Sequence, residues 1–128
     1  MPTRVRYSIV ASTTLVAVLL YLDRNCISMI AKDDDFRSAF GIGQEGAFAV
    51  MAMFYLAYAL AQVPAGWLAD RYGARKMMTG YVLLWSACTI MTGLAGGLML
   101  LLASRFLFGL AQAGCSPTSG SLIKRWMP

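Results

Sequence analysis

Long apolar stretches separated by short polar gaps dominate the pattern of the chain. The four stretches cover about residues 7–31, 46–69, 77–94 and 98–123. Each is long enough to cross about 30 Å of hydrocarbon. A spanning segment must satisfy its own backbone hydrogen bonds, which favours a helix for each stretch. The pattern therefore predicts an all-α membrane protein with four transmembrane helices.

The first stretch has the basic start of a secretory signal peptide, because Arg4 and Arg6 precede it. It is longer than such a peptide and has no convincing small-residue cleavage site. It also contains the charged pair Asp23 and Arg24. We therefore expect it to be a transmembrane helix that is retained.

Basic residues gather in the gaps on alternate sides of the predicted helices. One side holds seven of the eleven Lys and Arg residues: Arg4, Arg6, Arg71, Arg75, Lys76, Lys124 and Arg125. The gap at residues 32–45 has two basic residues and four acidic ones. The positive-inside rule then predicts that both chain ends are cytoplasmic and that residues 32–45 form an external loop. The expected location is the plasma or inner membrane.

Composition supports a membrane environment and argues against other classes. Hydrophobic residues make up 59% of the chain and charged residues 13%, whereas a soluble domain carries about a quarter charged residues. The net charge of +5 does not predict nucleic-acid binding, because the basic residues lie in gaps and not along one face. The chain has no histidine and no CxxC spacing, so we expect no metal site, cofactor or enzymatic activity. Cys26, Cys88 and Cys115 are expected to be small packing residues.

Small residues mark two places where helices should meet closely. Ala57, Ala61, Ala65 and Ala69 recur every four residues in the second stretch. Such a stripe lets a neighbouring helix approach. Residues 95–97 allow only a tight turn between the third and fourth stretches.

The gap between the second and third stretches carries the most specific motif. It reads Gly66-Trp67-Leu68-Ala69-Asp70-Arg71-Tyr72-Gly73-Ala74-Arg75-Lys76. Gly66 is expected to allow close helix packing, and Gly73 to permit a tight turn. Asp70 should lie at the membrane surface, facing a helix amino-terminus or a cation. Arg75 and Lys76 should anchor the loop on the cytoplasmic side.

This segment resembles the signature loop of the major facilitator superfamily, GxLaDRxGxRk. The resemblance implies a 12-helix transporter fold built of three-helix repeats. This chain would supply the amino-terminal part, and carboxy-terminal helices would be its partners. The resemblance also implies a gate, in which Asp70 engages a helix of the carboxy-terminal half. Arg71 and Arg75 would hold the network of charges around it.

Two adjacent charges, Asp23 and Arg24, lie inside the first stretch. A charge at mid-membrane costs about 2.5 to 3.5 kcal/mol. The two side chains should therefore form an ion pair or face a water-filled cavity. The alternative is that the helix ends before Tyr21 and the pair is interfacial. The apolar run that resumes after the pair opposes this alternative. The pattern YxDRxxIS resembles the anion:cation symporter branch of the superfamily, whose members carry organic acids such as sugar acids.

The fourth stretch contains a further buried charge, Arg105, and resembles the same branch through its pattern RfxxGxxeAxxxP followed by WfP. Arg105 and Gln112 share a helix face, and Gly109 on that side can admit a close neighbour. The alternative for Arg105 is that it snorkels to the external surface. Many relatives have a glutamate at the position of Gln112, where it shares proton coupling. Glutamine cannot titrate, which leaves Asp23 as the candidate proton carrier and leaves sodium coupling or facilitated diffusion open.

By resemblance, Asp23, Arg24 and Arg105 would line one central cavity at the interface of two repeats. Two arginines suit a carboxylate or phosphate through bidentate hydrogen bonds. Tyr21 and Tyr58 are candidate hydroxyl contacts, although packing aromatics are equally consistent with their positions. We expect proton-coupled symport of an organic anion by alternating access. The alternatives are a transporter-like sensor and a free-standing four-helix membrane protein.

Overall fold

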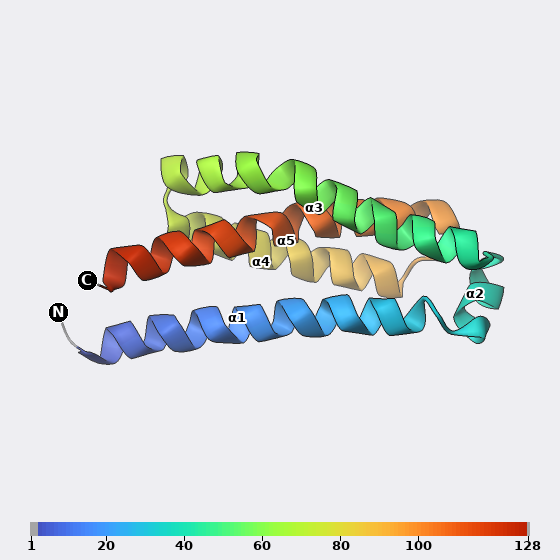
Figure 1. Cartoon of the computed structure of the whole chain (residues 1–128), viewed down its shortest axis with the longest axis horizontal. Helices are drawn as coiled ribbons and strands as arrows, with labels where there is room; N and C mark the ends of the chain where they lie inside the picture. The colour runs from blue at the N-terminus through green and yellow to red at the C-terminus, as the bar shows by residue number, and fades with distance from the viewer. Residues whose placement is uncertain (1–2, 128) are drawn as a thin grey trace.

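The computed structural model describes residues 3–127, and its regular structure is helical throughout that range (Figure 1). The helices are α1 (Thr3–Ile30), α2 (Asp34–Phe40), α3 (Gln44–Tyr72), α4 (Ala74–Gly93) and α5 (Leu98–Trp126). The prediction of an all-α chain is therefore confirmed. Each predicted apolar stretch falls in one of the four long helices.

The four long helices run side by side, and α2 lies across one end of them (Figure 1). Both chain ends and the α3–α4 connection lie at the opposite end. This arrangement gathers the basic gaps of the sequence at one end of the molecule. The predicted topology requires this, because it places both chain ends and the connection between the second and third apolar stretches on one side of the membrane.

Three of the helices are long and apolar enough to cross a membrane: Arg4–Ile30, Gln44–Tyr72 and Leu98–Trp126. The helix α4 is not among them. It has 20 residues and begins with Arg75 and Lys76 in its first turn. The count of four transmembrane helices therefore stays a prediction.

The expected external loop contains α2, which its own acidic residues stabilise. Asp33 caps the helix by accepting a hydrogen bond from the backbone N–H of Asp35 at 3.0 Å. Asp34 and Asp35 lie in the first turn, where the helix dipole favours negative charge. Gly41 ends the helix with a φ of 63°, the left-handed conformation that glycine adopts without strain.

The helix α5 packs at the centre, and two glycines bring its neighbours close. A Cβ added at Gly109 would lie 2.5 Å from the carbonyl oxygen of Phe54 and 3.0 Å from the Cβ of Ala57, both on α3. A Cβ added at Gly114 would lie 2.3 Å from the ring of Tyr81 on α4. The expected close approach at Gly109 is therefore present.

Most of the alanine stripe of α3 is buried. Ala57, Ala65 and Ala69 have exposed fractions between 0% and 5%, while Ala61 is half-buried. Gly66 lies against Pro117 of α5, and a Cβ added there would lie 3.4 Å from the Cβ of Pro117, an ordinary van der Waals contact. The close packing that requires glycine occurs in the middle of α3 and not at its end.

The helix α1 packs far less tightly than the others. Only 11% of its membrane-length stretch is buried, compared with 56% of that of α5. It continues unbroken to Ile30, so Asp23 and Arg24 lie within the helix and not beyond its end. The alternative of an interfacial pair after the helix was therefore wrong.

Candidate functional site

Asp23 is held by a side chain that the sequence analysis did not single out. Trp85 on α4 donates its indole N–H to Oδ2 of Asp23 on α1, at 2.7 Å. The side chain of Asp23 is half-buried, and Trp85 is 5% exposed. This is the one side-chain hydrogen bond that joins α1 to another helix within residues 3–127.

Arg105 of α5 points into the bundle. It is 4% exposed and donates a hydrogen bond to Oγ1 of Thr92 on α4. Its guanidinium carbon lies 4.4 Å from the ring centroid of Phe108, one helical turn away. The guanidinium is therefore enclosed, contrary to the alternative in which it extends to the surface.

A small cavity of about 140 Å³ brings Asp23 and Arg105 together between α1, α4 and α5. Its lining residues are Asp23, Cys26, Ile27, Ile30, Thr89, Thr92, Arg105 and Phe108. Asp23 and Arg105 do not form an ion pair. Within residues 3–127 the sole salt bridge links Arg37 to Asp34. The cavity thus contains one carboxylate and one guanidinium, each with its own hydrogen-bond partner.

Arg24 faces a different direction and does not line this cavity. Its guanidinium carbon lies 5.1 Å from the ring centroid of Tyr58 and 5.3 Å from that of Phe54, both on α3. The ring of Tyr21 is 5.8 Å away. Adjacent residues of a helix differ by about 100° in direction, which accounts for the separation of Arg24 from Asp23. The structure therefore groups Arg24 with Tyr21 and Tyr58.

Tyr58 also approaches α5, where its hydroxyl lies 3.4 Å from that of Ser116. Tyr21, in contrast, is 66% exposed and has Arg24 as its polar neighbour. The two tyrosines therefore belong to one cation–aromatic group, but only Tyr58 reaches the bundle.

Gln112 is the most unusual polar residue of the bundle. Its side chain is fully buried on α5, and within residues 3–127 neither its Nε2 nor its Oε1 has a hydrogen-bond partner. Leaving a buried polar group unsatisfied costs about 1–3 kcal/mol. Gln112 is not among the residues that line the cavity of Asp23 and Arg105.

We expect Gln112→Met to preserve or raise the stability of the protein. Methionine fills a similar volume without the desolvation cost of the amide, so the unfolding free energy should rise by about 1 kcal/mol. Thermal unfolding in detergent measures the change. Gln62→Met, at an exposed position of α3, is the matched control and should change little. A lower midpoint for Gln112→Met would mean that the bundle itself satisfies the amide.

The segment of residues 66–76 lies at the end of the bundle that carries the chain termini (Figure 1). Gly73 makes its turn with a φ of 96°, as the sequence predicted. Asp70 accepts a hydrogen bond from the hydroxyl of Ser121 on α5 at 3.3 Å. Arg71 lies 5.2 Å over the ring of Trp67 and forms no ion pair with Asp70. In this arrangement Asp70 therefore contacts α5.

The two basic residues that end the motif differ in their surroundings. Both are exposed, but only Arg75 lines the groove between α1, α4 and α5. Both begin α4.

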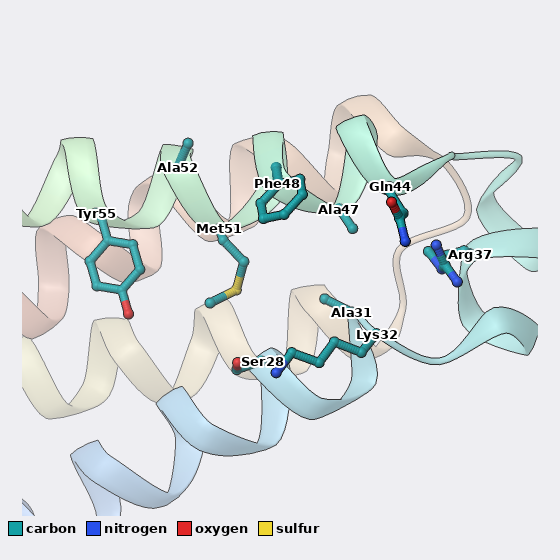
Figure 2. A pocket seen from close by; sticks show the side chains of 10 residues that line it. All are labelled: Ser28, Ala31, Lys32, Arg37, Gln44, Ala47, Phe48, Met51, Ala52 and Tyr55. Carbon is teal, nitrogen blue, oxygen red and sulfur yellow. The ribbon is translucent and has the colours of Figure 1, made fainter.

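A larger pocket of about 680 Å³ opens at the other end of the bundle, beside α2 (Figure 2). Figure 2 shows Phe48, Met51 and Tyr55 of α3 along one side and Ser28 of α1 across from them. Arg37 and Gln44 lie together at the end beside α2, and the side chain of Lys32 extends from there toward Ser28. The sequence analysis assigned no role to this region.

Trp85, Thr92 and Phe108 were also missed. Their only signal in the sequence was their position in apolar stretches, where an aromatic or threonine is normally a packing residue.

Comparisons with known proteins agree with the resemblance of the motifs. Residues 13–128 match the family model described as Major Facilitator Superfamily. A probable galactarate/D-glucarate transporter of Pseudomonas putida is 34% identical over 132 residues, covering 98% of this chain and 28% of that protein. A probable sulfoacetate transporter of Cupriavidus necator is 31% identical over 125 residues, covering 98% of this chain and 29% of that protein.

A D-galactonate transporter of Escherichia coli is similar to the same extent. It is 31% identical over 127 residues, covering 99% of this chain and 29% of that protein. The chain therefore spans less than a third of the length of these relatives. All three carry the names of transporters, in agreement with the prediction that the chain is not an enzyme.

Proposed function

The chain belongs to the major facilitator superfamily, and on that premise we propose that it forms the amino-terminal part of a secondary active transporter for an organic anion such as a sugar acid. The observation that carries the proposal is the small cavity that both Arg105 and Asp23 line. A buried guanidinium suits a carboxylate, and a carboxylate beside it can carry a proton. The names of the relatives supply the class of anion.

In this proposal Arg105 binds the anion through its free N–H groups. Its Nε is buried and has no partner within residues 3–127. Asp23 takes up a proton on one side of the membrane and releases it on the other. The amide of Gln112 contributes a neutral hydrogen-bonding group that does not titrate.

Arg24, Tyr21 and Tyr58 form a second polar group between α1 and α3. The guanidinium of Arg24 lies over aromatic rings and has an unpartnered, buried Nε within the described residues. We propose that this group contacts the anion when α1 moves relative to α3 during alternating access. The sparse packing of α1 supports such movement.

We further propose that α1, α3, α4 and α5 all cross the membrane, with both chain ends in the cytoplasm. Arg71 lies in the last turn of α3, Lys76 in the first turn of α4 and Lys124 in the last turn of α5. These helix ends lie at the end that carries the termini (Figure 1), which supports this orientation. The motif around Asp70 would then act as a cytoplasmic gate. Asp70, Arg71, Gly73 and Arg75 would engage carboxy-terminal helices of the same transporter.

A flux assay on the full-length transporter in proteoliposomes tests the function. We expect an inward proton gradient to drive accumulation of at least one of D-galactonate, D-glucarate, galactarate and sulfoacetate. Arg105→Ala should reduce both binding and uptake at least tenfold, because charge-assisted hydrogen bonds are worth about 1.5–3 kcal/mol. A sodium gradient in place of the proton gradient distinguishes the coupling ion.

Each other outcome of this assay contradicts a stated part of the proposal. Binding without flux would indicate a transporter-like sensor. Uptake that no ion gradient drives would indicate facilitated diffusion. Absence of binding to all four acids would exclude the proposed class of anion.

A further inference from the structure

The helix α4 gives each charge of the cavity its own hydrogen-bond partner. Trp85 donates to Asp23 of α1 at 2.7 Å, and Thr92 accepts from Arg105 of α5. Trp85 and Thr92 are about two helical turns apart, so they lie on one face of α4. One face of one helix thus holds both the carboxylate and the guanidinium.

Packing fixes these two partners in place. The rings of Trp85 and Phe108 meet edge to face, with centroids 6.2 Å apart and an interplanar angle of 85°. Arg105 lies over the ring of Phe108, which is 1% exposed. The hydroxyl of Thr92 also lies 2.9 Å from the carbonyl oxygen of Cys88 on its own helix. The indole of Trp85 and the hydroxyl of Thr92 are therefore held in position. They cannot shift with Asp23 or Arg105 if either side chain moves toward the other.

The separate hydrogen bonds oppose a strong attraction. Two opposite charges that are close together and partly shielded from water attract each other strongly. Nevertheless, Asp23 and Arg105 line the same cavity without an ion pair. Arg24, the other charged neighbour of Asp23, lies against the aromatic rings of α3. An ion pair inside the cavity would leave the guanidinium much less available to an anion.

We propose that Trp85 and Thr92 are positioning residues that hold Asp23 and Arg105 apart, so that the guanidinium stays available to an organic anion. Trp85 donates a hydrogen bond to the carboxylate of Asp23, and Thr92 holds the guanidinium of Arg105 against α4 by accepting a hydrogen bond from it. The inference rests on the proposed function, because it takes Arg105 as the residue that binds the anion. It also explains why the carboxylate of Asp23 does not pair with Arg105 before an anion binds.

Binding to the full-length transporter tests this role, with D-galactonate, D-glucarate, galactarate and sulfoacetate as probes in calorimetry. Trp85→Phe keeps an aromatic ring but loses the donor, and we expect it to weaken binding at least tenfold. Thr92→Val should weaken binding similarly, and Thr92→Ser, which keeps the hydroxyl, should not. Ser86→Ala is the control on α4, because the exposed hydroxyl of Ser86 bonds only its own helix backbone.

A second substitution separates positioning from a general structural role. In a protein that already carries Asp23→Asn, adding Trp85→Phe should change affinity less than threefold, because a neutral side chain cannot capture the guanidinium. Equal weakening in both backgrounds would show that Trp85 only packs, and would overturn the proposal. Wild-type affinity in Trp85→Phe and Thr92→Val would overturn it as well.

An infrared measurement keeps this test independent of the proposed function. The carboxylate band of Asp23 is obtained by subtracting the spectrum of Asp23→Asn from that of the wild type. In Trp85→Phe, and in Thr92→Val if the first variant does not fold, the band should shift to the position of an arginine-paired carboxylate. If no probe binds, the proposed anion class fails, and the band still decides the present proposal. An unshifted band would overturn it.

Discussion

Asp23→Asn is expected to abolish proton-driven uptake by the full-length transporter while leaving anion binding and anion exchange largely intact. Asparagine has the size of aspartate, and its amide oxygen can still accept the N–H of Trp85. The hydrogen bond between α1 and α4 should therefore remain. Asparagine does not titrate, so the proposed proton carrier is lost. Uptake with and without a proton gradient, measured beside exchange of labelled anion, gives the result.

Two comparisons make this result specific to Asp23. Asp35→Asn, at an exposed carboxylate of α2, should leave proton-driven uptake unchanged. Full accumulation by Asp23→Asn would assign proton coupling to another residue. Loss of exchange together with uptake would mean that the carboxylate is needed for binding and not only for coupling.

Gly109→Ala is expected to separate α3 from α5 and to destabilise the protein severely. The added Cβ would lie 2.5 Å from the carbonyl oxygen of Phe54, which is a main-chain atom and cannot rotate away. Overpacking of a core usually costs about 1–3 kcal/mol, and we expect roughly 3 kcal/mol or more here. Thermal unfolding in detergent, or the yield of folded protein after purification, measures the loss.

Gly120→Ala is the matched control on the same helix. No heavy atom lies within 4 Å of a Cβ added at Gly120. Alanine favours the helix over glycine by roughly 0.5–1 kcal/mol, so this variant should be as stable as the wild type or slightly more so. Ala57→Gly should not rescue Gly109→Ala, because the carbonyl of Phe54 remains. Wild-type stability of Gly109→Ala would mean that the two helices can move apart at little cost.

The long helices could be predicted from the sequence because their apolar stretches are continuous. The short helix α2 could not, since its acidic residues and Gly41 are equally typical of a loop. Glycines also show the limit of sequence reasoning. Close neighbours were expected at both Gly66 and Gly109, but only Gly109 has no room for a Cβ, and only the position of α3 against α5 reveals the difference.

The candidate site was foreseen in part. The charges Asp23 and Arg105 were identified because charged residues are rare in apolar stretches. The direction of Arg24 could not be predicted, because it depends on how α1 is rotated about its axis. Trp85 was missed for a different reason: its indole has one polar atom, and the sequence does not reveal whether that atom has a buried partner.

The sparse packing of α1 has a consequence for how the protein is assembled. Because α1 precedes α4 in the chain, it would enter the bilayer before α4 exists. The other helices of this chain bury little of its apolar surface, so the lipid can stabilise it during that interval. Within residues 3–127 its one side-chain hydrogen bond to another helix comes from Trp85, and this bond becomes available only once α4 has been inserted. Biogenesis would thus proceed from an independent helix to a docked one, with the pairing of Asp23 and Trp85 as the event that sets the rotation of α1.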